Sequence, residues 1–312
     1  MEDLKNNTLQ KEFHILAFNS FAAWKFIIFY IVLLIYLLSV LGNIIIVILV
    51  CMISKLQNPM YFFLCNLSVQ DLMNVTGFQP KFLAITITGD TAITFPHCIT
   101  QIFIFIMCID TEFFLLTAMA YDRYVAICFP LRYSLIMNKR ICIYLATSCW
   151  CTGALNAMIY SLLISVLSFC KSKEINHLLC EVECILKLSC NDTRNVETLI
   201  FVESFLFGLF SFILVLTSYV CIISTIVKIR TNAGRLKAFS SCSSHLTVVV
   251  LLYGTSLSSY MKNGSEGSQE QDKLITMFYI MLIPVLNPLV YSLRNKDVLK
   301  AFTILTQKLF EL

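Results

Sequence analysis

The sequence predicts an all-α membrane protein: a seven-transmembrane helix bundle with a short amphipathic C-terminal helix on the inner leaflet. Of its 312 residues, 58% are hydrophobic and only 13% are charged, with a mean hydropathy of +0.80, a composition foreign to soluble domains. A helix crosses a bilayer with about 20 apolar residues. The chain offers seven runs of that kind, at residues 26–52, 59–80, 98–129, 141–166, 196–228, 239–261 and 273–293.

These runs divide the chain into an N-terminal segment at 1–25, a bundle at 26–293 and a tail at 294–312. The first 25 residues contain no short apolar core followed by a small-residue cleavage site, so we expect the first helix to act as its own anchor. In the tail, Val298, Phe302, Leu305 and Leu309 recur at helical spacing. This pattern indicates an amphipathic helix that lies on membrane lipid.

The distribution of charge predicts the orientation. The segments that a cytoplasmic C-terminus would place inside carry thirteen basic and three acidic residues. The positive-inside rule therefore places the N-terminus outside the cell and the C-terminus in the cytoplasm. The sequon at Asn6 then lies outside, where it is a candidate for glycosylation. The net charge of +4 reflects this topology and does not indicate nucleic-acid binding, since no basic cluster is interleaved with aromatic residues.

Polar residues inside the apolar runs are the first functional candidates. Asp71 and Glu112 are acids within the second and third runs, where an ionisable side chain is costly and usually functional. Asn43 in the first run needs a hydrogen-bond partner, and we expect a bond to Asp71 that holds the two helices together. Glu112 precedes Arg123 by eleven residues, so both lie on nearly one face of the third helix, roughly 16 Å apart.

Other classes of membrane protein fit the sequence poorly. The motifs of zinc proteases, serine hydrolases and phosphate-binding loops are all missing, and the four histidines are scattered, so we do not expect an enzyme or a resident cofactor. A transporter usually contains internal repeats with broken, glycine-rich helices, and no repeat is visible among the nine glycines.

Several stretches, taken in order along the chain, resemble odorant receptors, the largest branch of the rhodopsin-like G-protein-coupled receptors. They include PMYFFLCNLSVQDL at 59–72, MAYDRYVAICFPLRY at 119–133, KAFSSCSSHL at 237–246 and PVLNPLVYSLRN at 284–295. The resemblance extends over almost the whole chain. It implies a plasma-membrane receptor that binds a small, mostly apolar odorant and activates the stimulatory olfactory G protein, which raises cyclic AMP. The alternative is a rhodopsin-like receptor for a non-odorant metabolite outside the nose.

The resemblance also implies a switch at the inner end of the third helix. Arg123 would pair with Asp122 at rest and meet the heterotrimeric G protein in the active state. The further members of this switch are Tyr219, Asn287, Pro288 and Tyr291. Pro288 interrupts the backbone ladder near Asn287 and gives a bend that moves during activation.

A sodium site and two disulfides follow from the same resemblance. Asp71 and Glu112 would hold a sodium ion at the bundle core, because carboxylates suit a hard cation; alternatively, one of the two is simply protonated. Five cysteines lie at the outer face, and the family pattern pairs Cys98 with Cys180 and Cys170 with Cys190. Cys184 stands where a proline is usual and leaves an odd thiol, while a zinc site at His177 is disfavoured because this imidazole lacks ligand spacing.

Offsets from the matched motifs place the odorant between the third, fifth and sixth helices. The expected lining residues, each of which is equally suited to the bundle core, are Phe105, Ile106, Ile109, Asp110, Asn156, Tyr160, Glu203, Ser204, Phe207, Tyr253, Ser256, Leu257 and Tyr260. Asp110 and Glu203 are acids with no lysine or arginine at their depth, which favours odorants that carry a hydrogen-bond donor. The alternative is structural: Asp110 points at the fourth helix and bonds Asn156.

Overall fold

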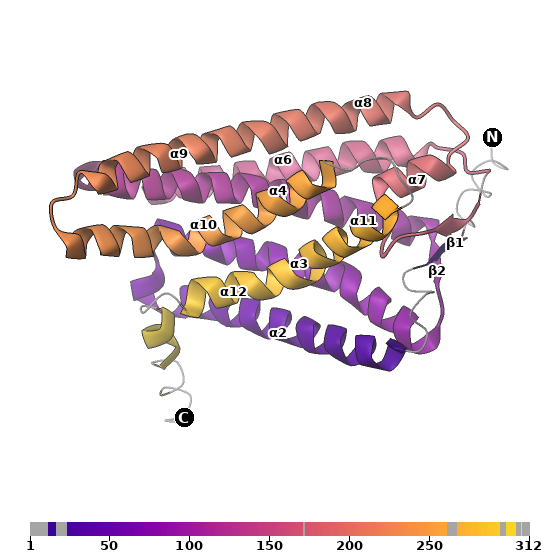
Figure 1. Ribbon diagram of the computed structural model, residues 1–312, viewed down its shortest axis with the longest axis horizontal. Helices are drawn as coiled ribbons and strands as arrows, with labels where there is room; N and C mark the ends of the chain where they lie inside the picture. Colours follow the sequence, from indigo (N-terminus) through magenta and orange to yellow (C-terminus); the bar gives the residue numbers. More distant parts are fainter. Residues whose placement is uncertain are drawn as a thin grey trace.

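A computed structural model describes residues 12–16, 24–170, 172–260, 267–293, 298–303 and 307. In that part of the chain, seven long helical rods form a bundle (Figure 1). The rods are α2 (Lys25–Met52), α3 (Pro59–Thr88), α4 (Phe95–Cys128), α6 (Lys139–Ser165), α8 (Arg194–Glu203) continued by η4 (Ser204–Leu209) and α9 (Phe210–Val227), α10 (Asn232–Tyr260), and α11 (Gly267–Met277) continued by η5 (Phe278–Leu282) and α12 (Ile283–Leu293). The seven-helix prediction is confirmed.

Most of these rods suit a bilayer by themselves. Six of the seven in the described part are long and apolar enough to cross a membrane. The seventh, α3, is less apolar because it carries polar side chains that it buries inside the bundle: Gln70, Asp71, Asn74 and Gln79. α3 therefore supplies polar side chains to the interior of the bundle.

The central helix is α4, which contacts α3, α6, α9 and α10. Its most apolar stretch is 67% buried, whereas the corresponding stretches of α2 and of the α8–α9 rod are 22% and 11% buried. The outer helices therefore present most of their apolar side chains to the surroundings, as expected in hydrocarbon.

The helix ends follow local capping rules. Asn58 and Asn138 accept hydrogen bonds from the backbone N–H groups of Tyr61 and Ile141, and so cap α3 and α6. α3 runs through Pro80 and stops at Gly89, whose left-handed conformation (φ 73°) ends the helix. It is thus eight residues longer than the apolar run that predicted it.

A small β-sheet covers one end of the bundle, and the sequence had not predicted it. Strand β1 (Glu12–Ile15) lies between β2 (Ala92–Thr94), with which it is antiparallel, and β3 (Glu174–Ile175), with which it is parallel. Phe13 is buried, and its ring lies 5.4 Å from that of Phe169. We call this the sheet end; helix α7 (Val182–Leu188) lies there too (Figure 1).

The opposite end carries the turn between α9 and α10 and a short helical segment at 298–303 (Figure 1). In this segment Val298 is buried, while Phe302 is 44% exposed. Leu305 and Leu309, predicted to share its apolar face, lie outside the described residues, as does Asn6.

Candidate functional site

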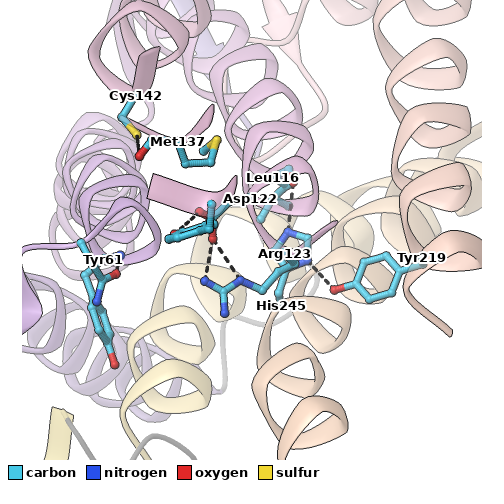
Figure 2. Close-up of polar contacts among 10 residues, drawn as sticks. Tyr61, Leu116, Asp122, Arg123, Met137, Cys142, Tyr219 and His245 are labelled. Atoms are coloured by element: carbon cyan, nitrogen blue, oxygen red, sulfur yellow. Dashed lines mark hydrogen bonds and ion pairs between the residues drawn. The ribbon is translucent and has the colours of Figure 1, made fainter. Parts of the chain in front are cut away.

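The predicted ion pair lies near the C-terminal end of α4, the end that we expect to face the cytoplasm. There Arg123 and Asp122 are in contact (Figure 2). Nη2 of Arg123 is 2.6 Å and Nε 3.1 Å from the same carboxylate oxygen, Oδ2 of Asp122, which is fully buried. Tyr133 of α5 (Tyr133–Ile136) donates its hydroxyl to the other oxygen at 2.7 Å. Burial and the Asp122 carboxylate raise the pKa of Tyr133, so its hydroxyl stays protonated. Arg123 and Asp122 are therefore paired, as the resemblance implied.

A buried histidine that the sequence analysis did not single out links three helices beside this pair. His245 of α10 places Nδ1 2.7 Å from the hydroxyl of Tyr219 in α9 and Nε2 3.0 Å from the carbonyl oxygen of Leu116 in α4 (Figure 2). A carbonyl only accepts, so Nε2 carries the proton and Tyr219 donates to Nδ1. A histidine inside the apolar run at 239–261 was the signal available to find it.

The core polar cluster lies midway along the bundle and comprises Asp71, Glu112, Asn287, Tyr279 and Gln70. Asn287 donates to Oδ2 of Asp71 at 2.9 Å, and the hydroxyl of Tyr279 donates to Oε2 of Glu112 at 2.9 Å. Gln70 approaches the same Glu112 oxygen at 3.5 Å. The cluster thus joins α3, α4, η5 and α12 through the two predicted acids.

Four oxygens in the core polar cluster are buried without a hydrogen-bond partner in the described structure: Oδ1 of Asp71, Oε1 of Glu112, Oε1 of Gln70 and Oδ1 of Asn287. Two carboxylates and two amide oxygens form a donor set that suits a hard monovalent or divalent cation. Among the described residues, no group of three or more His, Cys, Asp or Glu side chains is placed to hold a metal. Any ion here would therefore rely on the amide oxygens as well as the two acids.

The prediction that Asn43 bonds to Asp71 is wrong. The Asn43 amide donates to the carbonyl oxygens of Ser39, at 3.0 Å, and of Pro284 in α12, at 2.9 Å. Pro288 has no N–H, so it leaves the carbonyl four residues earlier, that of Pro284, without its helical partner. Asn43 fills that vacancy, and the bond joins α2 to α12 beside the proline bend.

Tyr291, one turn beyond Asn287 and Pro288, is also buried, and its hydroxyl has no hydrogen-bond partner among the described residues. Nearby, Ser244 of α10 donates to the carbonyl of Val290 at 3.0 Å. Arg123, Tyr219 and Tyr291, three of the residues expected to form the switch, lie toward the same end of the bundle, on helices that all contact α10.

Asp110 and Glu203, the acid pair, meet at one amide. Asn156 of α6 donates to Oδ2 of Asp110 at 2.7 Å and also contacts Oε1 of Glu203. Tyr160 of the same helix is buried as well. The structural alternative for Asp110 is therefore the arrangement observed. The acid pair lies between α4, α6 and α8, closer to the fourth helix of the bundle than expected.

The remaining residues expected to line an odorant site divide into separate groups. Tyr253 of α10 donates to the hydroxyl of Ser211 at 2.9 Å, and its ring lies 5.1 Å from Phe113. Phe105 instead faces Phe78 and Tyr279, at 6.0 and 5.8 Å.

Among the others, Ile106 is buried, Phe207, Ile109, Ser204 and Ser256 are half-buried, and Leu257 is 59% exposed. The side chain of Tyr260 lies outside the described part.

Two disulfides fasten the loop at the sheet end, with the pairing that the resemblance implied. Cys98 at the start of α4 joins Cys180, with Cα atoms 5.4 Å apart, and Cys170 joins Cys190 at 5.9 Å. Cys184 is in neither bridge. Nε2 of His177 lies 3.1 Å from Oε2 of Glu181, and among the described residues no group of three ligands for zinc is found.

Comparison with known proteins agrees with this arrangement. A family model described as olfactory receptor matches residues 32–308. The chain is 42% identical over 306 residues to Olfactory receptor 5AR1 of Mus musculus, covering 98% of this chain and 99% of the relative. It is 43% identical to Olfactory receptor-like protein OLF3 of Canis lupus familiaris (94% and 92% covered) and 42% identical to Olfactory receptor 9I1 of Homo sapiens (98% of both).

Proposed function

Because the chain belongs to the olfactory receptor family, we propose that it binds a small, mostly apolar odorant inside the bundle and activates a stimulatory G protein, which raises cyclic AMP. It is a multi-pass plasma-membrane receptor and not an enzyme. The observation that carries the signalling proposal is the closed pair of Arg123 with Asp122. Because the carboxylate of Asp122 is buried, its ion pair with Arg123 breaks only when the surrounding helices move.

In this proposal the sheet end lies outside the cell and Arg123 faces the cytoplasm. Thirteen basic against three acidic residues on the inner segments support that orientation. The two disulfides at the sheet end support it independently, since disulfides form in oxidising compartments.

The mechanism is a population shift. An odorant moves the equilibrium only by its preference for the active state. Activation would separate α10 from α4, which breaks the contact between His245 and Leu116 and frees Arg123 from Asp122. Tyr219 and Tyr291 would then line the opening that receives the G protein.

We further propose that the core polar cluster holds a sodium ion in the resting state. Its unpartnered oxygens on Asp71, Glu112, Gln70 and Asn287 are the ligands that this chain offers. A cation there would compensate the charge of two acids that face each other in a medium of low dielectric. A proton on one carboxyl would serve the same purpose, and a sodium-dependent change in thermal stability that disappears in Asp71→Asn would distinguish the two.

The test of the proposed function is a cyclic-AMP reporter assay in transfected cells exposed to an odorant panel. We expect at least one odorant to raise cyclic AMP in cells that express the receptor and to leave mock-transfected cells unchanged. An odorant that instead lowers forskolin-raised cyclic AMP would overturn the assignment of a stimulatory G protein.

A further inference from the structure

A cavity of 620 Å³ opens between α4, α6 and α9 and adjoins the expected odorant site at Phe114, whose ring lies 5.1 Å from that of Phe207. None of the described side chains expected to line the odorant site belongs to its lining. Three aromatic rings of α4 form one wall, those of Phe114, Tyr121 and Tyr124, while Ser148 and Thr152 of α6 lie on another. Its volume is within the range of about 300–1,000 Å³ that is usual for small-molecule sites.

The cavity opens sideways, out of the bundle. Tyr121 and Leu214, which line it, are 40% and 41% exposed. The helices that form it are all long and apolar enough to cross a membrane. The medium at its mouth is therefore lipid, and its occupant must arrive from the bilayer.

The lining chemistry narrows the class of occupant. No charged residue lines the cavity, which excludes ions and charged lipid headgroups. The hydroxyls of Thr117, Ser148 and Ser218 donate to carbonyls of their own helices at 2.8, 2.8 and 2.9 Å. Their oxygens still have lone pairs to accept a hydrogen bond. The walls thus suit an apolar body that carries a hydrogen-bond donor such as a hydroxyl.

A sterol has this chemistry: rigid, flat, apolar rings and one hydroxyl. Along α4 the lining extends from Phe114 to Tyr124, ten residues or about 15 Å, which is long enough for the fused rings of a sterol to lie along it. We propose that this cavity binds a membrane sterol, which packs against α4, α6 and α9. A phospholipid acyl chain is flexible and has no donor, so it leaves the hydroxyl oxygens of the walls unused.

The experiment uses the full receptor in phosphatidylcholine nanodiscs with a photoreactive cholesterol analogue. After irradiation, peptide mapping should find adducts at the cavity segments of α4, α6 and α9, and excess unlabelled cholesterol should remove them. Adducts spread over the exposed face of α2, or adducts that cholesterol does not compete, would overturn the proposal on the wild-type chain alone.

Two variants one residue apart sharpen the test. Ser148→Phe fills the cavity, while Thr147→Phe adds the same ring at an exposed position outside its lining. We expect cavity labelling to fall about tenfold in Ser148→Phe, a loss of about 1.4 kcal/mol, and to be unchanged in Thr147→Phe. Equal labelling of both variants would contradict the site. No odorant or G protein is present, so the result is independent of the proposed signalling.

Discussion

Replacing Asp122 with asparagine tests whether the closed ion pair holds the receptor at rest. Asparagine keeps the shape of aspartate but removes the charge that Arg123 contacts through Nη2 and Nε. If Arg123 leaves Asp122 on activation, the substitution weakens the resting state and leaves the active state almost unchanged. We therefore expect signalling without any odorant.

The magnitude follows from the geometry. Hydrogen bonds to charged groups contribute about 1.5–3 kcal/mol, and here two donors share one fully buried oxygen. A loss of about 2 kcal/mol multiplies the equilibrium constant for activation by roughly thirty. A receptor that is about 1% active at rest would become active in about a fifth of the molecules. Tyr133→Phe removes a single bond to the same carboxylate and should give a smaller rise.

The assay is basal cyclic AMP at matched surface expression. Asp192→Asn is a close control, because Asp192 forms an ion pair with Arg194 of the same 2.6 Å length. The side chains of Asp192 and Arg194 are 59% and 85% exposed, whereas those of Asp122 and Arg123 are 0% and 11% exposed. Exposed ion pairs contribute only about 0–1 kcal/mol to stability. Basal signalling that stays at the wild-type level in Asp122→Asn, or that rises equally in Asp192→Asn, would refute the reasoning.

Three further predictions concern other parts of the molecule. Arg123→Ala should reach the cell surface but lose odorant-evoked cyclic AMP, because the G protein loses its guanidinium contact; full signalling at matched surface level would contradict this. Cys98→Ser or Cys180→Ser should lose surface delivery, since the bridge spans 82 residues and contributes about 4 kcal/mol, whereas Cys184→Ser should be delivered normally, as surface staining would show. Glu203→Gln should weaken only agonists with a hydrogen-bond donor, about tenfold or more. Asp110→Asn disturbs the bond to Asn156 and should weaken all agonists alike. Dose–response curves for agonists with and without a donor decide between a ligand contact and a structural role.

The sequence was most informative where a single residue type or run determines the structure. Apolar runs predicted the helices to within a few residues at most ends, because hydrocarbon leaves the backbone no other choice. Apolar runs could not predict the small β-sheet. Its first strand has four residues, and its partners lie about 80 and 160 positions away in the chain. Pairing over such distances leaves no local pattern to recognise.

Hydrogen-bond partners inside the bundle were harder to predict than the residues themselves. Asn43 was correctly expected to bond across helices, but its partner is a backbone carbonyl that only the proline at 288 makes available. Tyr279 reaches Glu112 from η5, a π-helical turn that changes the register of the helix. Neither a freed carbonyl nor a π-turn is visible in the periodicity of apolar residues, so the sequence could name Asp71 and Glu112 but not their neighbours.

The polar contacts also suggest which helix moves. Hydrogen bonds of two buried acids, Asp110 and Glu112, hold α4 to its neighbours. Separating a buried acid from its partners costs much free energy in a low dielectric. α10 is tied by neutral bonds from His245 and Tyr253, each contributing about 0.5–1.5 kcal/mol. Their sum is comparable with the 1–3 kcal/mol of a typical coupling free energy between sites. Tyr253 lies eight residues, about 12 Å, from His245 along one helix. We therefore expect an odorant that displaces Tyr253 from Ser211 to loosen His245 from Leu116 through a movement of α10 as a whole.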